Sequence, residues 1–558
     1  MNVRFYRNIF ILMALFYFSC SKSSSNNTAP PVHENFICSS VTLNGVSSSS
    51  NNFTNVNLQP AIRLAFTTPV SHSSASAVIN FTSSTGVAVP IGFTFQNNDS
   101  VLVLQPTQKL SGIAAYTISV PTSLASQSGG NLTNAVTINL TTTIDSTRKF
   151  PQISDSALLT LIQQQTFKYF WDFGHPVSGL ARERSNGDNN TVTSGGSGFG
   201  IMAIVTGINR NFISRTQGLT RMQTIVSFLK NTAQKFHGAF PHWLNGTSGV
   251  VIPFSPNDDG ADLVETSYLM QGLLCARQYF NGAGADESTL RDDINTLWNG
   301  VEWDWFRQNN QNVLYWHWSP GKDWIINMPV KGWNECLITY VLGASSNTHN
   351  IPKSVYDNGW ASNGAMANGA SYYGYTLPLG PAYGGPLFFA HYSFLGINPN
   401  GLTDAYADYG TQNKNHSFIN YNYCKTNPKN YFGYSDSCWG LTASDIQNGY
   451  TASSPTNDVG VIAPTAAISS LPYTPTESMK ALKFFYYVLG DKLWKDYGFV
   501  DAFSLKDAWF AGSFLAIDQG PEIVMIENYR SGLLWNLFTS CPEVKTGMKS
   551  LGFSAPYL

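Results

Sequence analysis

The acidic stretch Asp258-Asp259-Gly260-Ala261-Asp262-Leu263-Val264-Glu265-Thr266 opens a long apolar run. It places four carboxylates in eight positions of a chain in which only 12% of residues are charged. If a helix begins near Asp259, Asp262 and Glu265 project from one face one turn apart, and Asp258 lies at its mouth. The stretch therefore predicts a helix whose first turn carries a group of acids.

Two interpretations of these acids stay open. Acidic residues in a first turn commonly cap a helix and complement its dipole, without a catalytic role. In the other interpretation, the stripe of Leu263, Ser267, Met270 and Leu274 packs inward and leaves the acids facing a cleft or solvent. Aromatic and amide-rich segments elsewhere favour the second interpretation, with a sugar in the cleft rather than a metal or a nucleotide.

Length and composition bound the class of protein. A chain of 558 residues predicts at least two domains. The formal net charge of −2 leaves no basic field, so we expect no nucleic-acid partner. Aromatic residues make up 14% of the chain, with 14 Trp and 27 Tyr, and flat rings suit the apolar faces of pyranose rings. The composition thus favours a carbohydrate ligand.

The first residues have the pattern of a targeting segment. Arg4 and Arg7 precede an apolar run over residues 9–18, too short to span a bilayer, and Cys20 follows it. This resembles a bacterial lipoprotein signal over residues 1–20, with a flexible linker over residues 21–35. It predicts lipidation of Cys20, a membrane anchor through that lipid and a place in the cell envelope, at the outer membrane, in the periplasm or on the cell surface. An ordinary cleaved signal peptide is the alternative.

Residues 36–145 predict a small all-β domain, because apolar residues alternate there in short ladders. The ladders are Ile62, Leu64 and Phe66; Ile91, Phe93 and Phe95; Val101 and Val103; Tyr116, Ile118 and Val120; and Val136, Ile138 and Leu140. Their spacing indicates an antiparallel sandwich, and the run over residues 63–70 resembles the bacterial Ig-like domains. We expect a spacer here, with glycan binding as the alternative.

Over residues 150–558 the apolar period becomes helical. Ser154 or Asp155 can cap a first helix that ends near Trp171. Further helices are expected over residues 290–305, 333–342, 386–395, 478–489 and 521–538. The pattern suits an α/α toroid, whose active site is assembled from loops and helix starts at one end. A helical solenoid is the alternative, although the sequence shows no repeat of fixed period.

Other segments supply polar groups for a site. Glu335 follows Gly332-Trp333-Asn334, where desolvation would raise its pKa and keep it protonated as an acid; an ordinary first-turn acid is the alternative. Asp445 and Asp518 each stand near a Gly in an expected turn. Arg182 could grip hydroxyls or pair with nearby acids.

The sequence lacks the motifs of several other classes of enzyme. The sequence contains no G-x-S-x-G elbow, no H-x-x-x-H pair and no Cys/His cluster, which disfavours a serine hydrolase and a metalloenzyme. We therefore expect no metal and no cofactor. Among the cysteines, Cys424 with Cys438 is the pair considered as a disulfide.

Six segments in order resemble the glycoamylase-like domain: residues 258–266, 332–335, 384–394, 439–445, 462–467 and 518–521. The pattern is most similar to glycoside hydrolase family 144. That resemblance implies an (α/α)6 barrel that hydrolyses β-1,2-glucan with inversion and without a metal. It also implies that Asp258, Asp262, Glu265 and Glu335 are the candidate catalytic acids. Residues 427–433 and their flanks look like an insertion relative to the family pattern.

These observations together predict a mainly α protein, with an (α/α)6-barrel hydrolase domain after an Ig-like sandwich. Glu335 is the expected general acid and Asp258 the expected base, with Asp445 and Asp518 as rivals, because inversion needs one carboxyl to protonate the leaving oxygen and one to activate water. Asp262 and Glu265 are expected to bind hydroxyls. The further substrate-binding candidates are Arg182, Trp243, Trp333, Asn334, His391, Trp439, Asp445 and Asp518.

The expected partner is a β-glucan, and the protein is expected to be a monomer. Endo action and release of sophorose or short sophorooligosaccharides both stay open. Within the enzymes, a β-glucosidase or a transglycosylase is the rival; outside them, a glycan-binding lipoprotein without catalysis.

Overall fold

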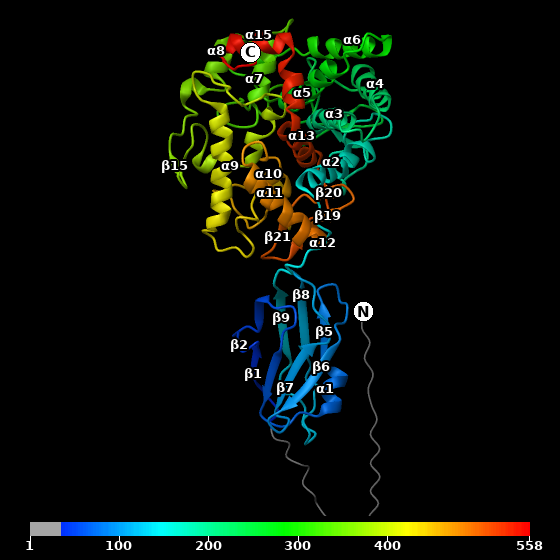
Figure 1. Cartoon of the computed structure of the whole chain (residues 1–558), viewed down its shortest axis with the longest axis vertical. Coiled ribbons are helices and arrows are strands. Elements are labelled where there is room, and N and C mark those ends of the chain that lie inside the picture. Colours follow the sequence, from blue (N-terminus) through cyan, green and yellow to red (C-terminus); the bar gives the residue numbers. More distant parts are fainter. Residues whose placement is uncertain (1–34) are drawn as a thin grey trace, which may run out of the picture. The chain divides into compact units, whose positions relative to one another are not determined.

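The computed structural model describes residues 35–558, and the chain divides into two compact units after Thr143 (Figure 1). The predicted signal segment, its lipidation at Cys20 and most of the predicted linker lie outside the described residues. Among the helices of residues 35–558, none combines the length and the apolar character that crossing a membrane requires.

The first unit is a β-sandwich of two sheets, with strand orders β2-β1-β4-β7-β6 and β3-β9-β8-β5. Its elements are β1 (Cys38–Leu43), β2 (Val46–Ser47), β3 (Asn52–Val56), β4 (Ile62–Phe66), α1 (His72–Val78), β5 (Asn80–Ser83), β6 (Ile91–Gln96), β7 (Val101–Pro106), β8 (Ala115–Val120) and β9 (Val136–Thr142). Among the strands of residues 38–142, each pairing of neighbours is antiparallel except that of β3 with β9. Ile62 and Leu64 of one sheet and Ile118 and Ile138 of the other are fully buried in one core, which confirms the ladders of these strands. The ladder of Val101 and Val103 is wrong, because Leu102 and Leu104 of β7 are the residues fully buried in that core and Val103 is only half-buried.

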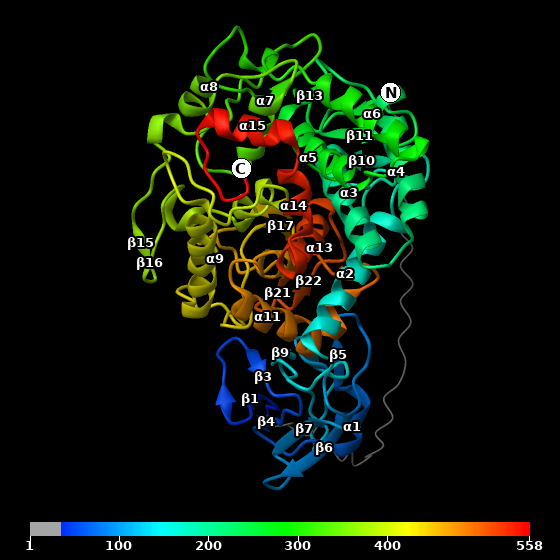
Figure 2. The same ribbon diagram turned by 45° about the horizontal axis from the view of Figure 1, so that its top comes forward.

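The second unit is an (α/α)6 barrel. Its helices are α2 (Asp155–Trp171), α3 (Ser194–Asn209), α4 (Arg215–Asn231), α5 (Leu263–Tyr279), α6 (Ala285–Asn299), α7 (Leu337–Ser345), α8 (Lys353–Asn358), α9 (Tyr409–Thr426), α10 (Pro464–Ile468), α11 (Pro475–Lys483), α12 (Gly490–Leu493), α13 (Ala516–Ser531), α14 (Leu533–Thr539) and α15 (Pro542–Leu551). Helices α13 and α14 run near the middle of this unit, and α4 and α9 lie toward opposite edges (Figure 2).

Helices α3 and α5 pack with unusually little space between their backbones. A Cβ on Gly198 of α3 would collide with the carbonyl of Tyr268 in α5, and a Cβ on Gly272 of α5 would collide with the carbonyl of Gly198. Both helices, with α7 and α10, are buried along almost their whole length, whereas α4, α6 and α15 bury only one face. The glycines thus set the inner helices close enough to share a site at their N-terminal ends.

Several helix boundaries differ from those expected, for local reasons. The helix expected near Asp259 begins at Leu263, because Ala261–Asp262 pairs as β13 with His317–Trp318 as β14. All of α5 from Leu263 to Arg277 is buried, so its acids face the barrel interior rather than solvent. Ser154 is the N-cap of α2, as predicted.

Three other expected helices change form. Residues 386–395 form two 3-10 turns, η4 (Leu387–Ala390) and η5 (Ser393–Leu395), after a glycine pair with positive φ. The helix expected over residues 333–342 begins only at Leu337. The helix expected over residues 521–538 breaks at Gly532, whose φ of 68° belongs to the left-handed region that ends helices.

The remaining expected helices also shift. Residues 478–489 span the end of α11 and a π-helical turn, η6 (Phe484–Val488). Helix α6 ends at Asn299, and Trp305 falls in the separate 3-10 turn η1 (Trp305–Arg307).

Candidate active site

Asp262 is fully buried at the start of α5, where it caps the helix. Its Oδ1 accepts the N–H groups of Val264 at 3.0 Å and Glu265 at 2.9 Å, and its Oδ2 lies 3.0 Å from Nδ1 of His242. Burial opposes the charge of Asp262, but the bond to His242 and the charges of His317 and His242 outweigh it and lower the pKa of the carboxyl. Asp262 is therefore a carboxylate whose two oxygens are both occupied.

Glu265 lies one turn later and bridges to the next inner helix. Its Oε2 accepts the N–H of Gly195 at 2.8 Å, in the first turn of α3, and the hydroxyl of Thr193 at 3.4 Å. A helix N-terminus attracts negative charge, but burial dominates and raises the pKa of Glu265. The close approach of α3 and α5 is what brings these groups together.

Asp258 lies in the turn before β13, and its side chain is buried. Burial raises its pKa to about 7; the charges of Asp262 and Glu265 add to this rise, and the charge of His242 opposes it. Its Oδ2 lies 3.5 Å from Nε2 of His317, on β14. Asp258 can therefore gain and lose a proton near neutral pH.

Glu335 precedes α7 and is half-buried. Its carbonyl accepts the hydroxyls of Tyr268 and Ser393, which fix the backbone beside α5 and η5. Burial raises the pKa of its carboxyl to about 7, and the charges of Glu265 and Asp262 raise it further. The sequence-based prediction of an acid that is protonated by desolvation agrees with this direction.

A second group of carboxyls comes from the chain beyond residue 440. Asp445 on β17 (Ala443–Ile446) receives Nη1 of Arg184, 3.2 and 3.3 Å from its two oxygens, and the hydroxyl of Ser513 at 2.5 Å. Asp501 Oδ2 accepts the N–H of Asp445 at 2.6 Å. Asp445 is thus held by a cation and a hydroxyl, while Asp501 fixes its backbone.

Asp501 and Asp518 form a buried carboxyl pair. The two side chains hydrogen-bond each other, although Asp501 Oδ1 and Asp518 Oδ2 receive no N–H or hydroxyl donor in the described residues. Burial raises the pKa of Asp501 to about 6 and raises that of Asp518 well above its usual value, and the negative charge of Asp501 and the hydrogen bond between the two carboxyls add to the rise at Asp518. One proton is therefore shared, and Asp518 carries it.

A pocket of about 490 Å³ is lined by residues that bind carboxyls of both groups. It is lined by Glu183, Arg184, Thr193, His242, Trp243, Phe254, Tyr450, Leu515 and Ile517. His242 and Thr193 bind Asp262 and Glu265 on one side, and Arg184 binds Asp445 on the other. The exposed ring of Phe254 packs on His242 at 4.3 Å and on Trp243 at 4.8 Å. Aromatic rings and charged hydrogen-bonding groups thus share one cavity, an arrangement suited to a sugar.

Tyr392 connects the two groups electrostatically. Burial raises the pKa of its hydroxyl far above the usual value, and the charges of Asp518, Glu335 and Glu265 raise it further. Charges from both carboxyl groups therefore act at one buried tyrosine.

Four predicted binding residues have other roles. Arg182 donates to the carbonyls of Asn189 and Phe173 and stacks on the Phe173 ring at 4.6 Å. Trp333 packs against Trp360, Phe394 and Tyr409 in an aromatic core. His391 is buried with Nε2 3.1 Å from the hydroxyl of Ser470, and burial lowers its pKa to about 3. Trp439 is fully buried and donates to the Glu477 carbonyl.

These contacts occupy Arg182 and bury Trp333, His391 and Trp439, and none of the four lines the pocket of about 490 Å³. Asn334 also has a local role, since its Oδ1 accepts the N–H of Cys336 at 2.9 Å. Cys424 and Cys438 are buried free thiols, so the disulfide considered for them is not formed.

Sequence reasoning missed Arg184, His242, Phe254, Tyr450 and Asp501 as parts of the site. His242 belongs to no motif, yet its Nδ1 lies 3.0 Å from Oδ2 of Asp262 and the residue lines the pocket. Arg184 stands two residues after Arg182, and the sequence carries no signal that separates the two. Asp501 has no Gly-rich motif around it, and its role depends on contacts to Asp445 and Asp518.

His242, Asp258 and Asp262 also bring three potential ligand atoms within 4.8 Å of one another. Burial lowers the pKa of His242, but the charges of Glu265, Asp262 and Asp258 and the bond to Asp262 raise it to about 9. At neutral pH the imidazole is therefore a cation that already balances these acids, and it would have to lose a proton before it could bind a metal.

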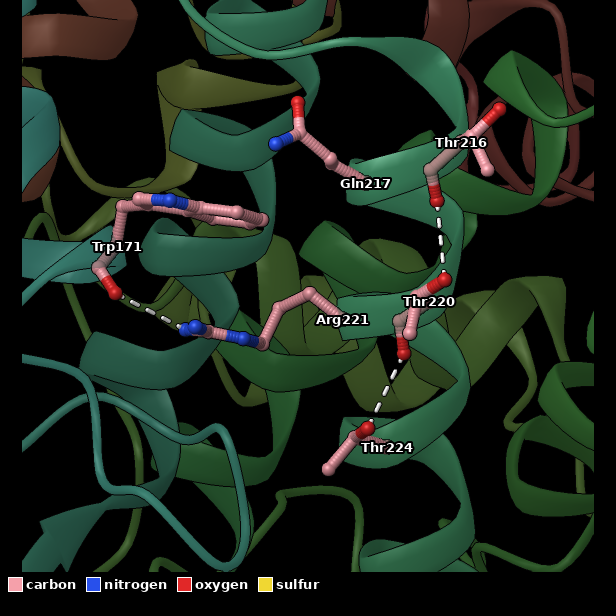
Figure 3. Close-up of a pocket in the computed structure, with 6 residues that line it drawn as sticks. All are labelled: Trp171, Thr216, Gln217, Thr220, Arg221 and Thr224. Atoms are coloured by element: carbon pink, nitrogen blue, oxygen red, sulfur yellow. Dashed lines mark hydrogen bonds between the residues drawn. The ribbon is translucent and has the colours of Figure 1, made fainter.

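A second pocket, of about 340 Å³, lies beside α4 and the end of α2 (Figure 3). Arg221 lies under the Trp171 ring at 4.4 Å and donates to the Trp171 carbonyl (Figure 3). The hydroxyls of Thr220 and Thr224 donate back to carbonyls of their own helix. No acid lines this pocket, so it offers no general acid or base.

Comparison with known proteins places this site in a family. The Glycoamylase family model matches residues 327–542, and the bacterial Ig-like domain model matches residues 42–142. The solved structure of an endo-β-1,2-glucanase from Chitinophaga pinensis, in complex with sophorotriose and glucose, is 53% identical, with a TM-score of 0.71 over 73% of this chain and 100% of that chain. The chain belongs to the glycoamylase-like family.

Two further family members extend the comparison. A β-1,2-glucanase from Parabacteroides distasonis is 38% identical with a TM-score of 0.70, over 92% of this chain and 74% of that one. An exo-β-1,2-glucooligosaccharide sophorohydrolase acting at the non-reducing end, from the same species, is 46% identical over 420 residues and 72% of this chain. The chain spans 58% of the length of that curated relative.

Proposed function

We propose that this protein hydrolyses β-1,2-glucan with inversion of the anomeric configuration, using two carboxyl groups and no metal. The observation that carries the proposal is a pocket lined by aromatic rings and by His242, Thr193 and Arg184, which bind the carboxyls of Asp262, Glu265 and Asp445. The names of its relatives support the substrate: an endo-β-1,2-glucanase and an exo-acting sophorohydrolase are among them.

Glu335 is the proposed general acid. Its carboxyl keeps a proton near pH 7 because burial raises its pKa to about 7. In the reaction it gives this proton to the glycosidic oxygen as the bond from that oxygen to the anomeric carbon breaks. The negative charges of Glu265 and Asp262 also favour the protonated form of Glu335 before the reaction.

Asp258 is the proposed base, which takes a proton from the water that attacks the anomeric carbon from the opposite face. A pKa of about 7 suits a base that works near neutral pH. Its rival Asp518 holds the proton that it shares with Asp501 and so cannot accept another. Asp445 remains a rival, although Arg184 and Ser513 occupy it.

The role expected for Asp262 changes with the structure. Both of its oxygens are occupied, by helix N–H groups and by His242. We propose that it orients His242 at the pocket wall, and that His242, Arg184 and Glu183 contact the sugar hydroxyls. Trp243 and Phe254 offer ring faces for the pyranose units.

The test is product analysis with the purified protein on a panel of soluble β-1,2-, β-1,3-, β-1,4- and β-1,6-glucans. Reducing ends should appear from β-1,2-glucan alone, and proton NMR of the first product should show the α-anomer. Release of sophorose alone indicates exo action, and a ladder of oligosaccharides indicates endo action. Cleavage of another linkage, glucose as the first product or retention at the anomeric carbon would each overturn this proposal.

We also propose that a lipid on Cys20 anchors the protein in the cell envelope, on the evidence of the sequence pattern at residues 4–20. Cys20→Ala should move the protein from the membrane fraction to the soluble fraction with its glucanase activity intact. Persistence of the variant in the membrane fraction would contradict the anchor.

A further inference from the structure

A separate pocket of about 290 Å³ follows the 3-10 turn η1. Two indole rings, Trp305 and Trp324, and four polar residues, Asp304, Gln308, Asn309 and Asn310, line it. None of these residues belongs to the candidate active site. Their combination of flat rings and amides is the usual lining of a site for a neutral sugar.

The two rings are held in place before any ligand arrives. His237 stacks on Trp305 with ring centres 3.5 Å apart and planes 9° apart, and Glu302 holds His237 Nδ1 at 2.9 Å. Trp324 lies 4.8 Å from Trp305 and packs edge-on against Phe306 and Tyr315. Rings fixed in this way lose little conformational entropy on binding.

The polar rim is also fixed. Gln308, Asn309 and Asn310 have consecutive positive φ angles of 43°, 65° and 60°, a conformation that needs support from its surroundings. Arg307 gives that support by donating to the carbonyls of Asn310 and Gln311. The loop therefore presents three neighbouring amide side chains, each of which can both donate and accept hydrogen bonds.

The charges around this pocket favour an uncharged ligand. Its one acidic lining residue, Asp304, lies 3.0 Å from Nδ1 of His349. No lysine or arginine lines it, and Arg307 is directed to backbone carbonyls. An anionic ligand would find no cation here, whereas sugar hydroxyls would find amides.

One strand connects this pocket with the candidate active site. Trp318 packs edge-on against both Trp305 and His237, each with ring centres 5.6 Å apart. Its neighbour His317 lies 3.5 Å from Asp258, and both residues form β14, which pairs with β13 just before α5. The pocket therefore lies at the same end of the barrel as the acids.

We propose that the Trp305–Trp324 pocket is a second carbohydrate site, which holds part of a β-1,2-glucan chain away from the bond that is cut. The identity of the glucan rests on the proposed function; the existence of a neutral-sugar site rests on the pocket itself. A glucan molecule bound at this site stays close to the active site, because both sites contact the same glucan molecule.

The test uses Trp324→Ala in the full-length protein, with Trp324→Phe to keep a ring and Ile325→Ala as the matched control. Ile325 is the neighbour in the same loop, is 52% exposed and does not line the pocket. Migration in native gels with and without β-1,2-glucan measures binding, and KM for the polymer measures capture. Trp324→Ala should bind the polymer about tenfold more weakly and show a KM about tenfold higher than the wild type. Trp324→Phe should recover most of this loss, and Ile325→Ala should match the wild type in both measurements.

The outcomes separate this proposal from the proposed function. If the wild type cuts β-1,2-glucan and Trp324→Ala migrates and captures polymer as well as Ile325→Ala does, the second site is refuted. If the wild type cuts no β-1,2-glucan, but a gel containing β-1,2-glucan slows the wild type and not Trp324→Ala, hydrolysis is refuted and the second site stands. Retardation by another β-glucan and not by β-1,2-glucan would overturn the proposed ligand.

Discussion

Glu335→Gln tests the proposed mechanism most directly, because glutamine keeps the shape of the side chain but has no proton to give. A carboxyl with the ordinary pKa of 4.5 would be protonated in about one of 300 molecules at pH 7, whereas a pKa of about 7 leaves about half protonated. Burial at the end of the barrel thus increases the acid form by about 150-fold. The substitution removes that form altogether.

The expected loss in kcat on β-1,2-glucan is roughly 100- to 10,000-fold, the usual contribution of a general acid, with a small change in KM. The assay is the release of reducing ends across pH 5 to 9. The wild type should lose activity as the pH rises through about 7, because Glu335 then releases its proton. The residual activity of the variant should lack this alkaline limb.

A substrate with an activated aryl leaving group supplies the control, since its departure needs little protonation. Glu335→Gln should recover most of its rate on that substrate, while Asp258→Asn should not, because the attacking water still needs a base. Near-normal turnover of β-1,2-glucan by Glu335→Gln, or an alkaline limb that persists in it, would refute the assignment of the acid.

Three further predictions concern charge and packing. His242→Gln removes a cation that lowers the pKa of Asp258, so the acid limb of the kcat/KM profile should move to higher pH; an unmoved limb would exclude Asp258 as the base. Burial raises the pKa of Glu522 to about 8, so the folded state keeps a proton that the unfolded chain releases and loses stability as the pH rises from about 4.5 to about 8. The free energy of unfolding of Glu522→Gln, measured in urea relative to that of the wild type, should therefore be greater at pH 8 than at pH 5 by on the order of 3 kcal/mol. The same difference between variant and wild type at pH 5 and at pH 8 would contradict this. Gly272→Ala should cost roughly 1–3 kcal/mol by forcing α3 and α5 apart, while Gly284→Ala, which meets open space, should cost much less.

The sequence predicts the parts of this molecule that depend on local period and local chemistry. The ladder of Ile62, Leu64 and Phe66 alternates because one face of β4 is buried, and that alternation is visible without a structure. Ser154 caps α2 through a bond to Ala157, three residues away. Asp262 and Glu265 are separated by one turn, so their shared place at the start of α5 follows from spacing alone.

The partners of those acids could not be predicted, because they come from distant parts of the chain. Glu265 is bound by Gly195, 70 residues earlier, and Asp262 by His242, 20 residues earlier. Aromatic residues mislead for a related reason: Trp333 and Trp439 stand in family-like segments, yet tertiary packing buries them, while Phe254 stands in no motif and lies exposed in the pocket. Motif position identifies a segment, but only packing decides which side chain of that segment meets the ligand.

The division of labour among the carboxyls follows from the donors that each receives. Asp262 receives two N–H groups and the His242 cation, so its charge is stabilised in spite of full burial. Within residues 35–558, Glu335 receives only its own backbone N–H, and Asp518 only another carboxyl, so burial prevails and both keep a proton. A carboxyl that receives helix N–H groups and a cation, as Asp262 does, stays ionised in this barrel, whereas a buried carboxyl without such donors keeps its proton. The same type of side chain therefore serves both as an acid and as a carboxylate. A protonated carboxyl and an ionised one are the two states that the proposed inverting mechanism requires.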